Sequence, residues 1–467
     1  MSALNRMNVK PEQAVYTLVV GLGKTGLSVV RYLRSIGENI IVADSRDIPP
    51  GLKELKADFS DVEYHTGSFN RSVFLGAHRI IVSPGVALTE PALIAARKNN
   101  IEIIGDIDLF AHEVMAPVVG ITGSNGKSTV TTLLASMASQ AGLNAVASGN
   151  IGTPVLDALD DDVDLYVLEL SSFQLETLQR LPMKAAVVLN ISADHMDRYD
   201  SLAAYAASKQ AIYDNADVLV VNKDDPLASK VASSDKKRVQ YSLGTAAEDE
   251  FGFCEYDRCD DFNAENTRSA VSLCFGNKFL IAADELKIKG RHNLQNALAA
   301  FAMGYALGLP FDDMITALKE FSGLPHRTQF VAEIDGINWI NDSKATNVGA
   351  CMASLQGLAG KHILIAGGEA KGADFAELTA VIAKHCHGVV LIGKDAAQIK
   401  AVMPKEMKTV FAQDMQAAVS AARNMAGEMA GKGDNVLLAP ACASFDMFDN
   451  FEHRGDVFIR SVEALIS

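Results

Sequence analysis

Short apolar runs rich in β-branched residues alternate along this chain with longer stretches whose apolar residues recur at helical spacing. This alternation is typical of α/β domains with mostly parallel sheets. A more irregular stretch, 230–285, contains turn signals, and we expect further β structure there. The expected strands lie at 16–21, 39–44, 79–85, 116–123, 164–171, 185–192, 217–222, 337–343, 362–368, 388–393, 408–412 and 435–440.

The apolar runs fall into three sets, which predicts three α/β domains. A chain of 467 residues is too long for one hydrophobic core. Glycine and proline in SGLPHR, between a helical pattern and the third set, mark one boundary, and another falls near Gly105. The expected domains are 1–106, 107–323 and 324–467.

Composition narrows the class of protein. No apolar run approaches the ~18 residues of a membrane span, and MSALNRMNVKPEQ lacks the apolar core of a secretory signal. We therefore expect a cytoplasmic protein. The net charge of −15 would repel nucleic acid. An anionic small molecule would need locally concentrated lysine and arginine.

The cysteines are scattered at 254, 259, 274, 351, 386 and 442, without a C-x-x-C pair. This pattern favours free thiols in a reducing compartment over a disulfide framework or a zinc site.

A glycine-rich turn follows the first expected strand. Gly21, Gly23 and Gly26 form G-x-G-x-x-G, and Asp44 ends the next apolar run. This spacing is the fingerprint of a dinucleotide-binding βαβ unit, in which the acid reaches a ribose hydroxyl. The motif indicates a bound diphosphate at a helix N-terminus.

A second glycine-rich loop, TGSNGKST at 122–129, carries the stronger chemical signal. Its backbone N–H groups can bind phosphates, Lys127 can reach the terminal phosphates, and Ser128 can hold Mg²⁺. Strict Walker spacing would require glycine at 121, where this chain has Ile121. The sequence therefore predicts a P-loop with a variant first half.

Acidic and imidazole side chains follow the next strands. Glu169 lies inside an apolar run, where either Mg²⁺ or a structural cation would offset the cost of burying its charge. Asp194 and His195 follow another strand, at the edge where open α/β sheets bind ligands. Lys209, in a helical stretch, reads from chemistry alone as a surface lysine.

These stretches together resemble the Mur ligases of peptidoglycan synthesis over nearly the whole chain. TGSNGKST, LELSSFQLE, ADHMDRY, GRHNLQNALAA, GLPHR, NDSKATN and GGEAKGADF occur in the family's order. NDSKATN and PACASFDMFDNFEHRG are most similar to the members that add D-glutamate. The resemblance implies a Rossmann-like N-terminal domain, a central P-loop ATPase-like domain and a Rossmann-like C-terminal domain.

The family's reaction implies the substrates and cofactors. ATP phosphorylates a substrate carboxylate to an acyl phosphate, which an amine attacks through a tetrahedral intermediate, with release of ADP and phosphate. For the D-glutamate-adding members the partners are UDP-N-acetylmuramoyl-L-alanine, D-glutamate and ATP, with two Mg²⁺ ions. We expect a monomer.

The resemblance assigns roles residue by residue. The expected catalytic residues are Lys127, His195, Lys209 and Lys344. The expected metal ligands are Ser128, Glu169, His195 and, if it is carbamylated, Lys209. The expected ATP contacts are Gly123, Ser124, Asn125, Gly126, Lys127, Ser128, Thr129, Asn293, Asn296, Arg327 and Asp342. The expected D-glutamate contacts are Lys344, Thr346, Lys371, Ser444 and Phe451. The expected contacts of the UDP-sugar are Lys24, Thr25, Asp44, Ser45, Arg46, Ser83, Gly85 and Asn150.

Other functions stay open at this point. An NAD-dependent oxidoreductase explains residues 19–46 but not the P-loop, and an ATP-binding scaffold leaves Lys344 and Lys371 without a purpose. These lysines also fit solvated loop positions. A sister ligase that adds another amino acid shares the central domain, and folylpolyglutamate synthases lack a first domain of this kind.

Overall fold

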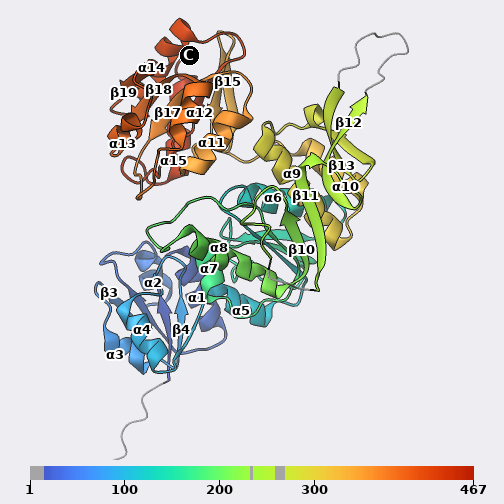
Figure 1. Cartoon of the computed structure of the whole chain (residues 1–467). Helices are drawn as coiled ribbons and strands as arrows, with labels where there is room; N and C mark the ends of the chain where they lie inside the picture. Colours follow the sequence, from blue (N-terminus) through green and yellow to red (C-terminus); the bar gives the residue numbers. More distant parts are fainter. Residues whose placement is uncertain (1–14, 232–234, 258–268, 467) are drawn as a thin grey trace, which may run out of the picture. The chain divides into compact units, whose positions relative to one another are not determined.

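The computed structural model describes residues 15–231, 235–257 and 269–466 (Figure 1). Within these residues the strands form three sheets, and the chain divides into two compact units. The first unit comprises the described residues of Met1–Ala116 together with Ser148–Asp162 and Ser171–Pro182. The second comprises Pro117–Ala147, Val163–Leu170 and the described residues of Met183–Ser467. The protein is an α/β protein, as the apolar pattern predicts.

The N-terminal sheet has the strand order β3-β2-β1-β4-β5, and every neighbouring pair is parallel. Its strands are β1 (Thr17–Val20), β2 (Ile40–Asp44), β3 (Glu63–Thr66), β4 (Arg79–Val82) and β5 (Glu102–Ile104). The helices of this unit are α1 (Lys24–Ser35), α2 (Leu52–Asp58), α3 (Arg71–Gly76), α4 (Pro91–Lys98), α5 (Asp106–Glu113) and α7 (Ser172–Thr177). The parallel strands place all their carboxyl ends, including the glycine-rich turn, at one edge.

The central sheet, in the second unit, has the order β14-β13-β12-β11-β10-β9-β6-β8-β7. Its strands are β6 (Val118–Thr122), β7 (Ala145–Gly149), β8 (Leu165–Glu169), β9 (Met183–Val188), β10 (Ala216–Asn222), β11 (Lys237–Thr245), β12 (Glu250–Asp257), β13 (Ser269–Phe275) and β14 (Lys278–Ala282). Its helices are α6 (Lys127–Gln140), α8 (Leu202–Gln210), η1 (Ala211–Asn215), η2 (Ala283–Glu285), α9 (Arg291–Leu307) and α10 (Phe311–Glu320). Strand β6 pairs in parallel with β8 and β9, so the segments that follow these strands meet at one edge.

The C-terminal sheet has the order β15-β16-β20-β17-β18-β19. Its strands are β15 (Gln329–Ile334), β16 (Ile337–Asn341), β17 (His362–Gly367), β18 (Cys386–Ile392), β19 (Lys408–Phe411) and β20 (Asn435–Leu438). Its helices are α11 (Val348–Gly357), α12 (Leu378–His385), α13 (Ala396–Ala401), α14 (Met415–Met429) and α15 (Phe451–Glu463). All pairs are parallel except β15 with β16, which form a hairpin.

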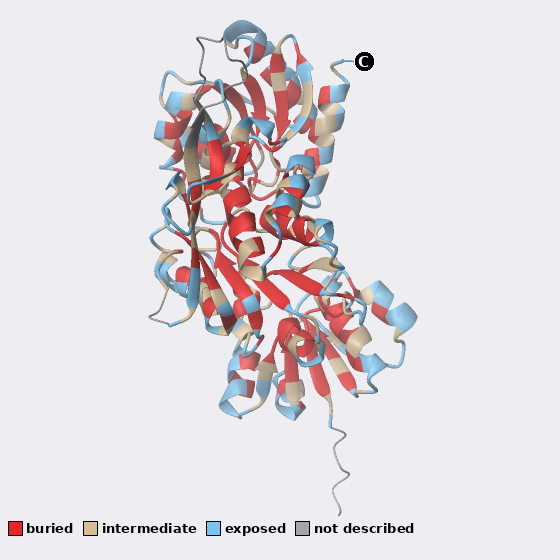
Figure 2. Cartoon of the chain, turned by 90° about the vertical axis from the view of Figure 1, so that its right-hand side faces the viewer, coloured by how far each residue is buried: buried red, intermediate tan, exposed pale blue. Residues whose placement is uncertain are grey.

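The inner strands of the sheets are buried on both faces, which explains why they read as continuous apolar runs rather than as alternating patterns. Many strand residues are coloured red for buried in Figure 2, while many helices show pale blue exposed residues. In the C-terminal sheet, Leu364 and Val389 belong to one hydrophobic cluster and Ile365 and Val390 to another, so each strand contributes to a core on each face. Among the described residues no helix is both long enough and apolar enough to cross a membrane.

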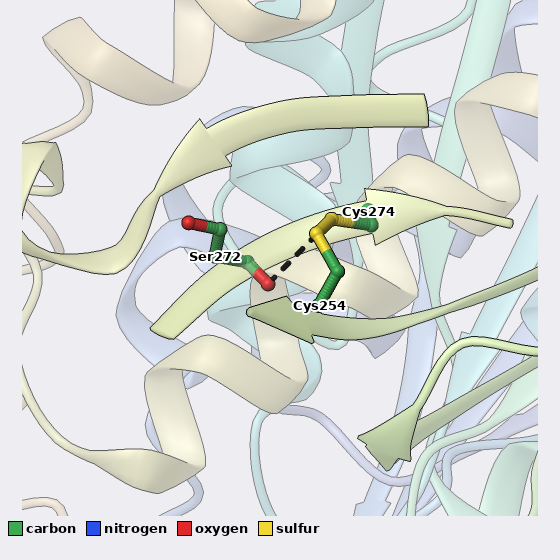
Figure 3. Close-up of a disulfide and its surroundings, with 3 residues drawn as sticks. All are labelled: Cys254, Ser272 and Cys274. Atoms are coloured by element: carbon green, nitrogen blue, oxygen red, sulfur yellow. Dashed lines mark hydrogen bonds between the residues drawn. A yellow bond between two sulfur atoms is a disulfide. The ribbon is translucent and has the colours of Figure 1, made fainter. Parts of the chain in front are cut away.

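The irregular stretch 230–285 contains the expected β structure, in β11 to β14. The structure corrects the expectation of free thiols here, because Cys254 on β12 and Cys274 on β13 form a disulfide (Figure 3). The two strands are antiparallel, and Cys254 lies opposite Ser272, next but one to Cys274. A search for closely spaced cysteines misses a pair that a hairpin brings together. Cys351, Cys386 and Cys442 are free and buried, and Cys259 lies outside the described residues.

Candidate active site

The loop between β6 and α6 has the conformation of an anion-binding turn. Gly126 is left-handed, with φ +87°, and a side chain there would overlap the amide of Asn296 on α9. Lys127 folds back over the loop, where Nζ donates to the carbonyl oxygens of Gly123 at 2.8 Å and Ser124 at 3.1 Å. The backbone N–H groups at the start of α6 and the ammonium therefore face the same small space, as phosphate binding requires.

Side chains that follow β9 fix this loop. The backbone N–H of Asn125 donates to Oδ1 of Asn190 at 2.8 Å, and Nδ2 of Asn190 returns a bond to the Asn125 carbonyl at 3.0 Å. Ser124 Oγ donates to the Ser192 carbonyl at 3.0 Å and accepts from its N–H at 2.9 Å. Asn190 and Ser192 are not among the residues predicted from the sequence, because the pairing of β6 with β9 is what brings them to the loop.

Arg327, which contacts Ser128, lies close enough to the carboxylates of Glu169 and Asp342 for their charges to act on it. Arg327 Nη2 donates to Ser128 Oγ at 2.6 Å. Burial lowers the pKa of Arg327, and the carboxylates of Glu169 and Asp342 act in the opposite direction. Glu169, at the end of β8, is only 2% exposed. Arg327 thus joins the chain segment before β15 to the start of α6.

His195 follows β9 in a left-handed backbone conformation, with φ 55°. Its N–H donates to Oδ1 of Asp194 at 3.0 Å, and its Nε2 lies 3.8 Å from Oδ2 of the same carboxylate. Burial lowers the pKa of His195; Asp194 opposes this shift, while the cations Lys127 and Lys371 add to it. The imidazole is therefore neutral at pH 7, the form that binds metal ions.

Lys209, on α8, is not a surface residue, because only 1% of it is exposed. Its Nζ lies 3.5 Å from Thr122 Oγ1 and 4.7 Å from the centre of the Tyr205 ring. Burial holds the pKa of Lys209 well below its usual value, and the nearby cation Lys127 acts in the same direction. The surface-lysine interpretation is therefore wrong, and Lys209 stands beside the end of β6 as a weakly basic amine.

A pocket of about 290 Å³ opens next to the P-loop. Asn296 Nδ2 donates to Asn293 Oδ1 at 3.2 Å, so the two predicted nucleotide contacts form one pair on α9. Asp342 accepts from Thr328 N–H at 3.1 Å and from Ser354 Oγ. Burial raises the pKa of Asp342, although these hydrogen bonds favour its charged form. The pocket wall includes Asn125, Gly126, Thr129, Asn293, Asn296, Arg327, Asp342 and Lys344.

The predicted D-glutamate contacts lie at the carboxyl edge of the C-terminal sheet. Lys344 Nζ stands 3.8 Å from the centre of the Phe451 ring, and burial, followed by the charge of Arg327, lowers the pKa of Lys344 to about 8. It is therefore no freely solvated lysine. Lys371 is exposed and left-handed, with φ 49°, and its Nζ lies 5.0 Å from the Phe445 ring centre.

The two other predicted contacts in this region belong to ordered turns. The Thr346 N–H donates to the Lys344 carbonyl at 2.7 Å, and Ser444 is 2% exposed and accepts two N–H groups through its carbonyl. Beneath them the guanidinium of Arg454, on α15, donates to Ser343 Oγ at 3.0 Å and to the Cys442 carbonyl at 3.1 Å. Burial lowers the pKa of Arg454 to about 10. Arg454 lies in the motif PACASFDMFDNFEHRG, but nothing in the sequence indicates that its side chain connects these two loops.

In the first unit, Asp44 is engaged by its own neighbours. Its carboxylate accepts from the N–H of Leu22 at 2.7 Å and from Arg46 Nη2 at 2.6 Å. Burial raises the pKa of Asp44, but these bonds outweigh burial and hold it below its usual value. Asp44 therefore fixes the glycine-rich turn from the end of β2.

The remaining predicted UDP-sugar contacts all belong to this unit. Ser83 Oγ donates to the Gly21 carbonyl at 3.1 Å, which places the end of β4 against the turn. Asn150 belongs to the first unit through the segment Ser148–Asp162, although it follows the P-loop in sequence. The exposed or half-buried members are Lys24, Thr25, Ser45, Arg46, Ser83, Gly85 and Asn150.

Among the described residues, no group of three or more histidine, cysteine, aspartate and glutamate side chains could hold a metal ion alone. The predicted set differs in kind, since it combines a serine hydroxyl, one glutamate, one histidine and a lysine. Ser128 Oγ and Glu169 are oxygen ligands of the type that Mg²⁺ prefers. A hydroxyl oxygen has two lone pairs, so Ser128 can accept from Arg327 and still bind a cation. The residues present therefore fit the ion.

Three family models match this chain. Residues 15–105 match the N-terminal domain of MurD-like Mur ligases. Residues 121–304 match the Mur ligase middle domain. Residues 326–442 match the Mur ligase glutamate ligase domain.

Curated relatives and solved structures agree with these matches. The UDP-N-acetylmuramoylalanine--D-glutamate ligase of Nitrosococcus oceani is 47% identical over 98% of this chain and 99% of its own length. The enzyme of the same name from Pseudomonas aeruginosa is 46% identical over 96% of this chain and 98% of its own. A pseudomurein peptide ligase type C from Methanothermus fervidus (21% identity, TM-score 0.57) covers 96% of this chain and all of its own, and it shares the fold.

Proposed function

Because this chain belongs to the Mur ligase family, we propose that it joins D-glutamate to UDP-N-acetylmuramoyl-L-alanine. The chain is an ATP-dependent amide ligase of peptidoglycan synthesis. The observation that carries the choice of substrates is the identity of 47%, along 98% of the chain, to a ligase named for D-glutamate. That match includes the C-terminal sheet, whose loops would receive the amino acid.

The P-loop would bind and orient the phosphates of ATP. Lys127 would leave the carbonyls of Gly123 and Ser124 for the β- and γ-phosphates, and Arg327 would supply a second cation from the other side of Ser128. Asn293, Asn296 and the pocket beside them would take the nucleoside. The chain's contribution to phosphoryl transfer is then position and charge neutralisation, which are the main requirements of this reaction.

Mg²⁺ would be held by Ser128 and Glu169, and a second ion by His195 and a carbamylated Lys209. When bound, these ions supply charge neutralisation at the phosphates and at the acyl phosphate. Lys209 is suited to carbamylation, because burial keeps its amine neutral and a neutral amine is the form that adds to CO₂. The product would be a carbamate anion in place of a buried neutral amine, with release of one proton.

The amino acid would bind at the edge of the C-terminal sheet. D-Glutamate carries two carboxylates, and Lys344 and Lys371 would pair with them, with Thr346, Ser444 and Phe451 around the side chain. The α-amine would then attack the acyl phosphate, and the tetrahedral intermediate would expel phosphate to leave the amide. The face of the Phe451 ring would hold the Lys344 ammonium in position to pair with a carboxylate of D-glutamate.

The first unit would bind the UDP part of the acceptor. The turn after β1 and the N-terminus of α1 would hold the diphosphate, with Lys24 and Thr25, and Asn150 would join from its own segment. Asp44, Ser45 and Arg46 would serve the uracil end, near Ser83 and Gly85. We expect a monomer that works in the cytoplasm, where ATP and UDP-sugars are available.

An amino-acid panel tests the proposal. Phosphate release by the purified protein with ATP, Mg²⁺ and UDP-N-acetylmuramoyl-L-alanine should require D-glutamate. L-Alanine, L-glutamate and diaminopimelate should leave release at its background rate. Turnover with one of these and not with D-glutamate would instead assign the chain to a sister ligase. Omitting the UDP-linked acceptor should abolish release with every amino acid.

A further inference from the structure

Asn347 connects the C-terminal sheet to the P-loop through a single side chain. It is the N-cap of α11, where its Oδ1 accepts the N–H of Ala350 at 2.8 Å. Its Nδ2 donates to Asp194 Oδ2 at 3.1 Å and approaches Asn125 Oδ1 at 3.4 Å. Asn347 as a whole is 8% exposed, so water does not readily replace these partners.

The two ends of the Asn347 amide are chemically distinct, which fixes its orientation. The helix N-terminus offers only a donor, so it requires the amide oxygen. The Asp194 carboxylate is only an acceptor, so it requires the NH₂ group. Asp194 in turn uses its other oxygen for the N–H of His195, at 3.0 Å. One carboxylate therefore shares its oxygens between the predicted metal ligand His195 and the C-terminal sheet.

A second observation places the start of α11 against the same loop. Gly349, in the first turn of α11, lies so close to Ser192 that a Cβ there would stand 3.0 Å from Ser192 Oγ. Ser192 itself exchanges hydrogen bonds with Ser124 of the P-loop. Close packing and a charge-assisted hydrogen bond thus hold the same two elements together.

We propose that Asn347 is a positioning residue, which fastens the start of α11 to the loop after β9 and so sets where Lys344 stands relative to the P-loop. Lys344 lies three residues before Asn347 on the same loop, and the charges of Glu169 and Lys127 act on it. The amine of the amino acid must reach an acyl phosphate formed at the P-loop. The distance and orientation of the Lys344–Asn347 loop relative to the P-loop therefore control that attack. The inference rests on the proposed function.

Two substitutions separate this role from helix capping. Asn347→Ser retains a capping oxygen, since serine caps helices as well as asparagine does, but it is too short to reach Asp194. Asn347→Asp retains the cap and the size but sets a carboxylate against Asp194. We expect kcat/KM for D-glutamate to fall about tenfold in Asn347→Ser and further in Asn347→Asp. KM for the UDP-linked acceptor should stay near that of the unchanged protein in both variants. The melting temperature should change little in Asn347→Ser and fall in Asn347→Asp, where two largely buried carboxylates face each other.

The decisive measurement is an exchange of donor and acceptor. Asp194→Asn alone leaves one acceptor oxygen for two donors, so its NH₂ group must face either Nδ2 of Asn347 or the N–H of His195. Asp194→Asn with Asn347→Asp lets that NH₂ group donate to residue 347 while the amide oxygen still accepts from His195. The double variant should therefore recover at least about tenfold in kcat/KM for D-glutamate over the product of the two single effects. Losses that simply multiply, or a double variant slower still, would overturn the inference.

A matched control distinguishes this failure from others. Asn70 also caps a helix, α3 in the first unit, through its side-chain oxygen, which accepts the Ser72 N–H at 3.0 Å, and it is exposed. Asn70→Asp should leave every kinetic constant unchanged. If the unchanged protein does not turn over D-glutamate, the proposed function fails. If it does and the Asn347 variants match it, only the positioning role fails.

Discussion

Lys344 and Lys209 illustrate how burial sets the chemistry of single residues in this protein. Both are amines withdrawn from water, but Lys344 keeps a pKa of about 8 beside Phe451, while Lys209 is held well below the usual value. The first can therefore act as a cation near neutral pH and the second as a neutral amine. A sequence shows two lysines after or within ordinary elements, and only the packing around each one separates their roles.

The pH dependence of amino-acid binding follows from Lys344. Its pKa in the folded protein, about 8, lies below the usual 10.5, so the cation is lost as pH rises through 8. KM for D-glutamate should rise above that pH, and Lys344→Arg should remove the rise, because a guanidinium stays protonated. The measurement is KM for D-glutamate against pH in both proteins. The same pH profile in both would exclude Lys344 as the titrating group.

The lowered pKa of Lys344 also makes the free energy of unfolding depend on pH, and here a rise in pH is favourable. Because folding disfavours the protonated form of Lys344, the unfolded chain binds more protons between about pH 8 and 10.5. The contribution of this residue to the free energy of unfolding is therefore most unfavourable below pH 8. It improves as pH rises to 10.5.

Lys127→Ala tests the phosphate-binding role at the residue scale. Within the described part of the chain, the hydrogen bonds of its ammonium go to carbonyl oxygens of its own loop, in contacts that tolerate loss. The variant should fold normally but lose at least about 10²-fold in kcat, because the transferring phosphoryl group loses its nearest cation. ADP release is the measurement, with Lys53→Ala, an exposed change on α2, as the control. Full activity in Lys127→Ala would contradict the P-loop role.

At the scale of elements, the apolar pattern identified the strands that are buried on both faces. The strands it missed are β3, β5, β7 and β15, and each lies at the edge of its sheet. An edge strand packs fewer neighbours, so its sequence needs fewer apolar residues; β3, with the sequence EYHT, is mostly exposed. The site could be predicted only in part for a related reason. The contacts of Asn190 and Asn347 join residues that are far apart in the sequence, so they exist only once separate elements have packed together.

Gly26 and Gly23, both in the first glycine-rich turn, should have different roles, the first in packing and the second in ligand binding. A Cβ on Gly26, in α1, would overlap the Gly21 carbonyl, whereas one on Gly23 would meet nothing within 4 Å. Gly26→Ala should therefore destabilise the first unit by about 1–3 kcal/mol. Gly23→Ala should keep the melting temperature but raise KM for the UDP-linked acceptor, because the diphosphate approaches the backbone there. Equal melting temperatures in both variants would contradict this division.

The hairpin of β12 and β13 should depend on its disulfide. Linking Cys254 and Cys274 closes a loop of 20 residues, which in the chain-entropy picture stabilises the fold by about 3 kcal/mol. Denaturant unfolding of the second unit should therefore shift when Cys254→Ser is introduced or when a reductant is added. In a reducing cytoplasm this stabilisation is absent. An unfolding curve insensitive to both changes would show that the bond contributes nothing.

At the scale of the whole molecule, the two compact units are not built from consecutive stretches of the chain. The ranges expected from the sequence, 1–106, 107–323 and 324–467, remain a prediction. The first unit recruits Ser148–Asp162 and Ser171–Pro182 from beyond the P-loop. Asp157 there pairs with Arg31, and the Gln179 N–H donates to Asp108 at 2.8 Å. Polar contacts of this kind leave no mark on an apolar pattern.

Hydrogen exchange in dilute denaturant tests this grouping on the intact protein. Helix α7 belongs to the first unit, while β8 before it and β9 after it belong to the second. The amides of α7 should lose protection together with β1 and β4, at a different denaturant concentration from β8 and β9. Loss of protection of α7 in step with β8 and β9 would assign it to the second unit.

The dispersed first unit also has a consequence for biosynthesis. The ribosome releases all five strands of the N-terminal sheet before Ala116, yet the partners of Asp106 and Asp108 on and beyond α7 arrive only as Pro182 emerges. At ~5–20 residues per second that interval lasts seconds. Meanwhile β6, α6 and β8 are already outside and can begin to pair. The nascent chain must therefore carry an unfinished first unit while the second has already begun, so segments of the two units are synthesised in alternation up to Pro182.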